Sequence, residues 1–225
     1  MNDFFTKALE AHPDKESLLE ALFMLDRSPY GAETRLKYYT AKFKSVGQNV
    51  RIGAGVKIVG AEYISLGDNV TISDGCTLIA RGEGGIELGS GVRLQERVYL
   101  DTERPNGYIK VGQRVYIGTG TTLFGHVGLE IGDDCLLAQN ITITPYSHRF
   151  EDKNAIIYSQ GGNTRKVTIG RDCYLGMSVC VLYSADIGEG SVIGSASVVV
   201  KPIPPYSVAV GNPAKVIRKR GEEKK

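Results

Sequence analysis

Residues 167–199 read VTIGRDCYLGMSVCVLYSADIGEGSVIGSASVV, and an aliphatic residue returns at every sixth position of this stretch. The aliphatic positions are Ile169, Leu175, Val181, Ile187, Ile193 and Val199. The position four residues after each of them is also restricted, to small or aliphatic residues. An α-helix would repeat at about 3.6 residues, whereas a six-residue period is typical of a parallel β-helix in which each hexad is a short strand plus a turn.

The same repeat can be followed back to Val46, with a slip in its register after every third hexad. The slips follow Ile58, Leu78, Leu100, Leu123 and Ile143. If three hexads make one turn of a triangular prism, every insertion leaves the same corner, and insertions in a solenoid often gather on the binding face. We therefore expect about seven triangular coils with all extra loops at one edge, the longest at about residues 149–166.

The two ends of the chain depart from the repeat. Residues 1–45 have a helical pattern, with an apolar stripe at Leu18, Leu19 and Leu22 and a candidate boundary at Ser28-Pro29. Because the open end of a solenoid needs covering, we expect this segment to be a helical cap. The expected organisation is the cap at 1–45, the β-helix at 46–203, and a closing segment with a charged tail at 204–225.

Composition limits the classes of function. A net charge of +2 over 225 residues gives no concentrated basic stripe, which argues against a nucleic-acid partner. No apolar run is long enough to span a bilayer, and the N-terminus lacks the features of a signal peptide, so we expect a cytoplasmic protein with no transmembrane segment. Three of the four cysteines, Cys76, Cys135 and Cys173, fall in the small inward column, which favours buried free thiols in a reducing compartment.

These hexads resemble the hexapeptide-repeat acetyltransferases, the family that includes the maltose, galactoside and serine acetyltransferases and many polysaccharide O-acetyltransferases. The resemblance covers about residues 46–218 and is most specific at 167–199, at 203–207 (IPPYS) and at 211–218 (GNPAKVIR). It implies an all-β, left-handed parallel β-helix, although ordinary parallel crossovers are right-handed. It also implies a homotrimer with sites between adjacent prisms, and acetyl-CoA as cosubstrate; no metal is expected.

His148 is the candidate general base. A sugar hydroxyl needs a positioned base to take its proton as it attacks the thioester, and an unperturbed imidazole, with a pKa of about 6.5, suits this task. His148 ends the run TPYSH at 144–148, where the longest insertion begins, and it resembles the family's catalytic histidine. His126, in a neighbouring insertion at the same corner, and Tyr146 are expected to contact the substrate. Glu151 or Asp152 could orient the imidazole, and spacing selects neither.

The resemblance also predicts the contacts to CoA. The expected residues are Met177, Ser195, Ala196, Lys201, Lys215 and Arg218. The first three match positions along the pantetheine arm, and the three cations match positions that meet the phosphates of CoA. The Asn and Asp pair used by the disaccharide acetyltransferases is missing from residues 119–125, which leaves the acceptor open.

Together these features predict an acetyl-CoA-dependent O-acetyltransferase that acts on a hydroxyl of a sugar or a polysaccharide precursor. N-acetylation of an amino sugar, or acetylation of an antibiotic, stays open because the base requirement differs little. A non-catalytic β-helix scaffold is disfavoured by the coincidence of His148 with the closing signature. A β-helix carbonic anhydrase needs three histidine ligands for zinc, and only His126 and His148 could serve, because His12 lies in the cap.

Overall fold

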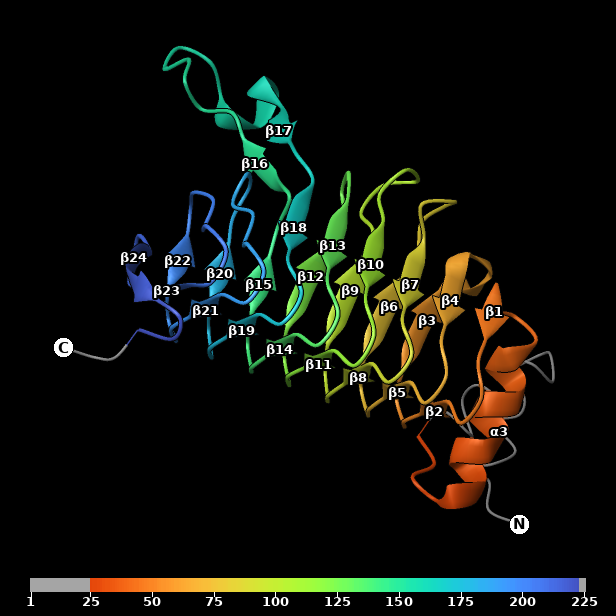
Figure 1. Ribbon diagram of the computed structural model, residues 1–225. Helices are drawn as coiled ribbons and strands as arrows, with labels where there is room; N and C mark the ends of the chain where they lie inside the picture. The colour runs from red at the N-terminus through yellow and green to blue at the C-terminus, as the bar shows by residue number, and fades with distance from the viewer. Residues whose placement is uncertain (1–24, 223–225) are drawn as a thin grey trace.

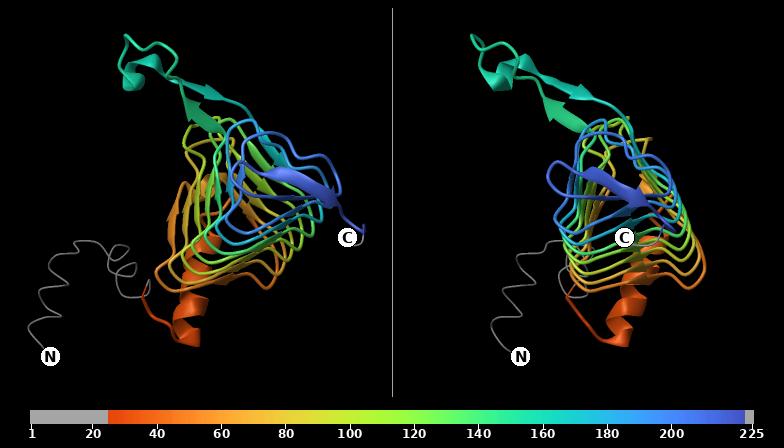
Figure 2. Two further views of the ribbon diagram at one scale, coloured as in Figure 1. Left: turned by 90° about the vertical axis from the view of Figure 1, so that its left-hand side faces the viewer. Right: turned by 60° about the vertical axis from the view of Figure 1, so that its left-hand side comes forward.

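The computed structural model describes residues 25–222, in which the chain winds through three parallel β-sheets that form the faces of a triangular prism (Figure 1, Figure 2). Sheet A contains β1 (Ser45–Val46), β4 (Ile64–Leu66), β7 (Ile86–Leu88), β10 (Ile109–Val111), β13 (Leu129–Ile131) and β18 (Val167–Ile169). Sheet B contains β2 (Arg51–Ile52), β5 (Thr71–Ile72), β8 (Arg93–Leu94), β11 (Tyr116–Ile117), β14 (Leu136–Leu137), β19 (Tyr174–Leu175), β21 (Val192–Ile193), β23 (Ser207–Val210) and β24 (Lys215–Lys219). Sheet C contains β3 (Lys57–Val59), β6 (Thr77–Ile79), β9 (Tyr99–Asp101), β12 (Thr122–Phe124), β15 (Thr142–Ile143), β20 (Cys180–Val181) and β22 (Val198–Val199).

Each passage through sheets A, B and C makes one coil, and successive coils stack in parallel register. In the first six coils, the connections from A to B and from B to C are each four residues long, as at 67–70 and 73–76. The seventh coil enters sheet A through a bridge at Ile187 and continues in β21 and β22. The expected β-helix of about seven coils is therefore confirmed.

All large variation in connection length falls where sheet C returns to sheet A, which we call the C–A edge. The connections there are residues 60–63, 80–85, 102–108, 125–128, 144–166 and 182–186. In Figure 1 these loops rise along the upper side of the prism. The prediction that the insertions share one edge is confirmed.

The longest insertion is an ordered two-stranded ribbon that projects away from the prism (Figure 1). Strands β16 (Tyr146–His148) and β17 (Gly162–Thr164) pair antiparallel, with Tyr146 opposite Thr164 and His148 opposite Gly162. A short 3-10 helix, η2 (Ile157–Gln160), lies between them. The ribbon thus begins at Tyr146, three residues before the loop expected at 149–166, because the chain pairs with itself soon after it leaves the prism.

The interior of the prism is filled by the two restricted columns of the repeat. The aliphatic column, including Ile169 and Leu175, is buried except at Val46 and Ile58 of the first coil, which are partly buried. Cys76, Cys135 and Cys173 lie in the second column and are buried free thiols, as expected. The glycine after an aliphatic residue sits at a corner against the next coil; a Cβ on Gly170 would lie 2.4 Å from the backbone nitrogen of Glu189.

Helix α3 (Pro29–Thr40) lies at the N-terminal end of the prism, beside β1 and β2 (Figure 1). The side chain of Ser28 caps it by accepting a hydrogen bond from the Gly31 nitrogen. The helix buries its own side chains Arg35 and Tyr39, and Arg35 Nε donates to the Ile52 carbonyl at 3.1 Å. This element is the predicted N-terminal helix; the earlier apolar stripe of Leu18, Leu19 and Leu22 lies outside the described residues.

At the C-terminal end of the prism, β23 still pairs in parallel with β21, and β24 folds back antiparallel on β23.

A second 3-10 helix, η1 (Ala61–Tyr63), occupies the first connection of the C–A edge. Within residues 25–222, every helix is too short or too polar to cross a lipid bilayer.

Candidate functional site

A row of rings runs along the C–A edge from sheet C onto the ribbon. Its members are Tyr99, Phe124, His126, Tyr146 and His148, and neighbouring ring centroids lie 6.1, 6.0, 5.0 and 4.8 Å apart. The register breaks predicted that His126 and His148 share one corner of the prism. Both histidines lie in this row of rings, and the ring of Tyr146 contacts each of them. The row connects the body of the prism to the root of its longest insertion.

His148 ends strand β16 and is exposed. Its Nδ1 lies 3.2 Å from the hydroxyl oxygen of Tyr146, and the two rings meet edge-on at 89°. Its other ring nitrogen, Nε2, has no hydrogen-bond partner among the described residues. An imidazole that is held at one nitrogen and open at the other can take a proton from a bound acceptor.

His126 is held differently, inside the short connection 125–128. Its φ is +37°, a conformation that residues other than glycine rarely adopt, and its Nδ1 is buried without a hydrogen-bond partner in the part of the chain described. Burial lowers the pKa of His126, the positive charge of Arg104 lowers it further, and Asp101 opposes both. The imidazole of His126 is therefore neutral at pH 7, and it stacks on the Tyr146 ring with an interplanar angle of 23°.

A buried carboxylate lies beside His126, on the last residue of β9. Asp101 is fully buried and accepts hydrogen bonds from Arg81 Nε (2.8 Å), Arg81 Nη2 (2.7 Å), the Tyr99 hydroxyl (2.9 Å) and the Glu103 nitrogen (2.7 Å). Burial raises the pKa of Asp101, but the hydrogen bonds, led by those from Arg81, outweigh it and hold the pKa below the ordinary value. We call Arg81, Tyr99, Asp101 and Glu103 the Asp101 cluster.

The Asp101 cluster was not predicted from the sequence. Asp101 lies in register with Ile79 and Phe124 on the neighbouring strands of sheet C. A carboxylate in a column that is otherwise apolar was the available signal. Its partner Arg81 comes from the preceding coil, twenty residues earlier, so no local motif joins the two.

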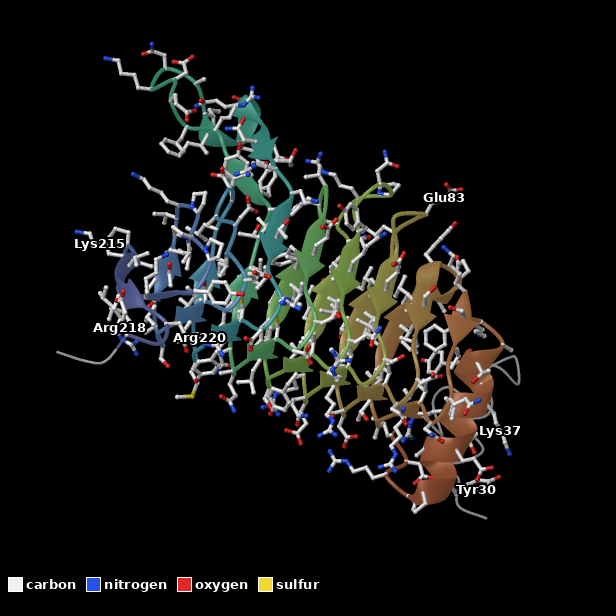
Figure 3. The ribbon with its side chains drawn as sticks, viewed as in Figure 1. Tyr30, Lys37, Glu83, Lys215, Arg218 and Arg220 are labelled. Carbon is white, nitrogen blue, oxygen red and sulfur yellow. The ribbon has the colours of Figure 1, made fainter. Side chains whose placement is uncertain are left out.

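The predicted CoA contacts fall in two groups. Met177, Ser195 and Ala196 lie in turns between sheets B and C, where the Ala196 nitrogen donates to the Met177 carbonyl at 2.8 Å. Lys201 follows β22, and Lys215 and Arg218 lie on β24. Figure 3 shows Lys215 and Arg218 at the C-terminal end of the prism, away from α3.

The structure brings Met177 and Ala196 together but separates them from His148. Met177 and Ala196 lie where sheet B leads into sheet C, which we call the B–C edge, whereas His148 lies on the C–A edge. Sheet C therefore lies between them. Within one chain, the candidate base and the candidate pantetheine contacts therefore occupy different edges.

The repeat described as the hexapeptide repeat of succinyl-transferase matches residues 45–80, 108–145 and 166–202. These segments contain every coil of the prism except the third, which is built from β7, β8 and β9. The chain belongs to the hexapeptide-repeat acyltransferase family.

Three relatives illustrate the range of this hexapeptide-repeat family. The chain is 36% identical over 135 residues to a probable acetyltransferase of Mycobacterium tuberculosis, a match that covers 60% of this chain and 44% of that protein. It is 35% identical over 121 residues to galactoside O-acetyltransferase of Escherichia coli, covering 52% of this chain and 57% of that enzyme. It is 29% identical over 186 residues to dTDP-4-amino-4,6-dideoxy-D-glucose acyltransferase of Escherichia coli, covering 80% of this chain and 84% of that enzyme.

The chain thus spans about half the length of the first two curated relatives, at 44% and 57%. Among solved structures, AntD, an N-acyltransferase from Bacillus cereus crystallised with dTDP and 3-hydroxybutyryl-CoA, superposes with a TM-score of 0.61. The superposition covers 83% of this chain and 88% of AntD at 22% sequence identity, so it shows a common hexapeptide-repeat fold.

Proposed function

We propose that this protein transfers an acetyl group from acetyl-CoA to a sugar or polysaccharide-precursor hydroxyl, with His148 as the general base. The observation that carries the proposal is the placement of His148. It stands at the root of the ribbon on the edge where the insertions gather, with Nδ1 bonded to Tyr146 and Nε2 open. His126 and Tyr146, next in the row of rings, are the proposed contacts to the acceptor.

Acetyl-CoA is the proposed donor. The exposed turns at Ser195 and Ala196 offer backbone groups to the pantetheine arm beside the half-exposed Met177. Lys201 and Lys215 are exposed, and Arg218 is partly so, which supplies positive charge for phosphates at the C-terminal end of the prism. The names of the relatives support acyl transfer, and the free thiols of the core are in keeping with a cytoplasmic protein.

A homotrimer is the proposed assembly. The pantetheine contacts lie on the B–C edge and His148 on the C–A edge, so one prism cannot bring them to a single acyl group. Packing the B–C edge of one chain against the C–A edge of the next would place donor and base on either side of one cleft. Multi-angle light scattering at the monomer mass would contradict this assembly.

The proposed function is tested by incubating the protein with acetyl-CoA and a panel of glycans and measuring acetylated product by mass spectrometry. A thiol reagent alone is a poor readout, because the half-buried Cys180 would also react. His148→Ala should lower kcat/KM by about 10²–10⁴-fold, the usual contribution of a positioned general base, and leave acetyl-CoA affinity nearly unchanged. His126→Ala should act mainly on the KM for the acceptor.

If His148→Ala keeps wild-type activity while His126→Ala is inactive, the two roles are reversed. If both variants stay active, the base is not a histidine. If wild-type protein neither binds acetyl-CoA at millimolar ligand nor acetylates any glycan, acyl transfer itself is the wrong function.

N-acylation of an amino sugar is the second candidate. The observation in its favour is the match to dTDP-4-amino-4,6-dideoxy-D-glucose acyltransferase, which spans 84% of that enzyme. A neutral amine is a better nucleophile than a hydroxyl, so His148→Ala should cost less with an amine acceptor. Parallel assays on a sugar alcohol and its amino analogue distinguish the two reactions.

A further inference from the structure

Tyr146 is fixed from two sides by parts of the chain far apart in sequence. One face of its ring stacks on His126, with the centroids 5.0 Å apart. Its hydroxyl end lies against the backbone of β17, where a Cβ added to Gly162 would fall within 2.3 Å of both Cζ and the hydroxyl oxygen. Gly162 has no positive φ, so its backbone conformation would accept a side chain, and the three atoms nearest to an added Cβ all belong to Tyr146.

We infer that Tyr146 is the positioning residue of His148, holding its imidazole so that Nε2 is the basic nitrogen. This inference rests on the proposed function and assigns the group that orients the base. In the arrangement we infer, Nδ1–H donates to the Tyr146 hydroxyl oxygen, 3.2 Å away, and the Nε2 lone pair stays free for the acceptor proton. After Nε2 takes that proton, the same Nδ1–H···O bond holds the imidazolium in place.

The carboxylates near His148 in sequence are engaged elsewhere. Glu151 Oε2 accepts from the Phe150 nitrogen at 3.0 Å, and Asp152 Oδ1 accepts from the Asn154 nitrogen at 2.9 Å. Both therefore order the backbone of the ribbon instead of the imidazole. A hydroxyl is left to do what a carboxylate does in the Ser-His-Asp arrangement, namely to fix the tautomer and the ring orientation.

The neutral charge state of His126 suits this arrangement. A second cation stacked on Tyr146, one ring away from His148, would oppose the positive charge that forms when the base takes up a proton. The buried Nδ1 of His126 and the positive charge of Arg104 keep the stacking partner uncharged. His126 thus supports Tyr146 without adding charge at the base.

The return strand of the ribbon is followed by two residues that form ion pairs with neighbouring coils. Arg165 Nη2 lies 2.7 Å from Asp186 Oδ2, and Lys166 Nζ lies 3.0 Å from Glu130 Oε2. Both pairs lie directly after the end of β17, where the chain re-enters the prism. Arg165 and Lys166 follow Gly162 by three and four residues, and Gly162 is on the strand that lies against the Tyr146 hydroxyl.

The test combines two substitutions that disturb Tyr146 differently with a matched control. Tyr146→Phe removes only the hydroxyl. Gly162→Ala keeps every polar group and adds a methyl where the Tyr146 ring now lies. Tyr158→Phe is the control, because it makes the same chemical change on the same ribbon at a side chain that is 89% exposed.

The primary readout is the tautomer of His148 in the free protein, measured by ¹⁵N NMR with labelled histidine. The chain has three histidines, so single variants suffice for assignment. We expect His148 to be the Nδ1–H tautomer in wild type and in Tyr158→Phe, and to lose that preference in Tyr146→Phe and Gly162→Ala. The kcat of the latter two should fall about tenfold, the value of one oriented hydrogen bond, with the KM for acetyl-CoA unchanged.

An Nε2–H tautomer in wild type, or a tautomer that survives Tyr146→Phe, overturns the inference. Gly162→Ala that folds and keeps both the tautomer and kcat also overturns it. If the tautomer depends on Tyr146 but wild type acetylates no acceptor, the positioning contact stands and the proposed function fails, so the two outcomes are separable.

Discussion

Replacing Arg81 by Met should destabilise the fold far more than the same change at Arg114. Both arginines make a bidentate pair with an aspartate one coil away, Arg81 with Asp101 at 2.8 and 2.7 Å and Arg114 with Asp134 at 2.6 and 2.8 Å. The pairs differ in burial. Arg81 and Asp101 are 45% and 0% exposed, whereas Arg114 and Asp134 are 58% and 49% exposed.

Arg81→Met removes two of the four hydrogen bonds that hold the buried carboxylate of Asp101. Breaking a fully buried ion pair costs about 3–5 kcal/mol because the remaining charge has no compensation. Because Arg81 is itself 45% exposed, and the Tyr99 hydroxyl and Glu103 nitrogen remain, we expect a loss of about 2–3 kcal/mol. Arg114→Met breaks an exposed pair and should cost about 0–1 kcal/mol.

The difference should depend on pH in a defined direction. In wild type the pKa of Asp101 is lowered, so its contribution to stability is present above the unfolded value and is lost as pH falls through the folded value. In Arg81→Met, the two hydrogen bonds and the positive charge of Arg81 are lost, so the pKa of Asp101 rises above its wild-type value and acidification neutralises the carboxylate more readily. The gap between wild type and Arg81→Met should therefore narrow as pH falls from 7 toward about 4.

Urea unfolding followed by far-UV circular dichroism measures these differences, at one fixed protein concentration because assembly adds to apparent stability. Equal losses in the two variants would show that burial of Asp101 contributes nothing. A gap that widens on acidification would contradict the assigned charge state of Asp101.

The charge and burial of single residues can be tested by three further measurements. Acetyl-CoA should raise the Tm by mass action, and alanine at Lys201, Lys215 or Arg218 should each reduce that shift in differential scanning fluorimetry; three unchanged shifts would place the phosphates elsewhere. Because burial holds the folded-state pKa of His126 below its unfolded value, wild-type stability should fall as pH drops below about 6.5, and His126→Gln should flatten that fall in urea melts. In native protein the half-buried Cys180 should react with a thiol reagent first, and faster reaction of any other cysteine would contradict the packing of the core.

Much of the fold could be predicted because its information is local. A hexad places one aliphatic and one small residue inward regardless of what lies on other coils, so the period is readable from a short window such as residues 169–181. The left hand of the coil, by contrast, was expected only from the family resemblance.

Helix α3 falls within the expected helical cap, although its sequence, PYGAETRLKYYT, has no continuous apolar stripe. The helix packs against the first coil through its own residues Arg35 and Tyr39.

The candidate site, too, was predicted only in part from the sequence. Register breaks alone put His126 and His148 at one corner, because a slip after every third hexad fixes which edge the insertions leave. The stack of Tyr146 on His126 and its contact with Gly162 depend on the angle at which the ribbon leaves the prism. The residues that follow β17 also form ion pairs with other coils, and no short stretch of sequence contains these contacts.

The sequence by itself determined the six-residue coil, the shared edge of the insertions, the inward cysteines and the histidine at the root of the longest insertion. Each of these follows from the spacing of residues along the chain. Only the tertiary structure decided that Asp101 is a buried charge neutralised by Arg81, that His126 is neutral, and that Tyr146 rather than Glu151 or Asp152 contacts His148. These properties depend on burial and on side chains from other coils, which meet only when the solenoid has stacked.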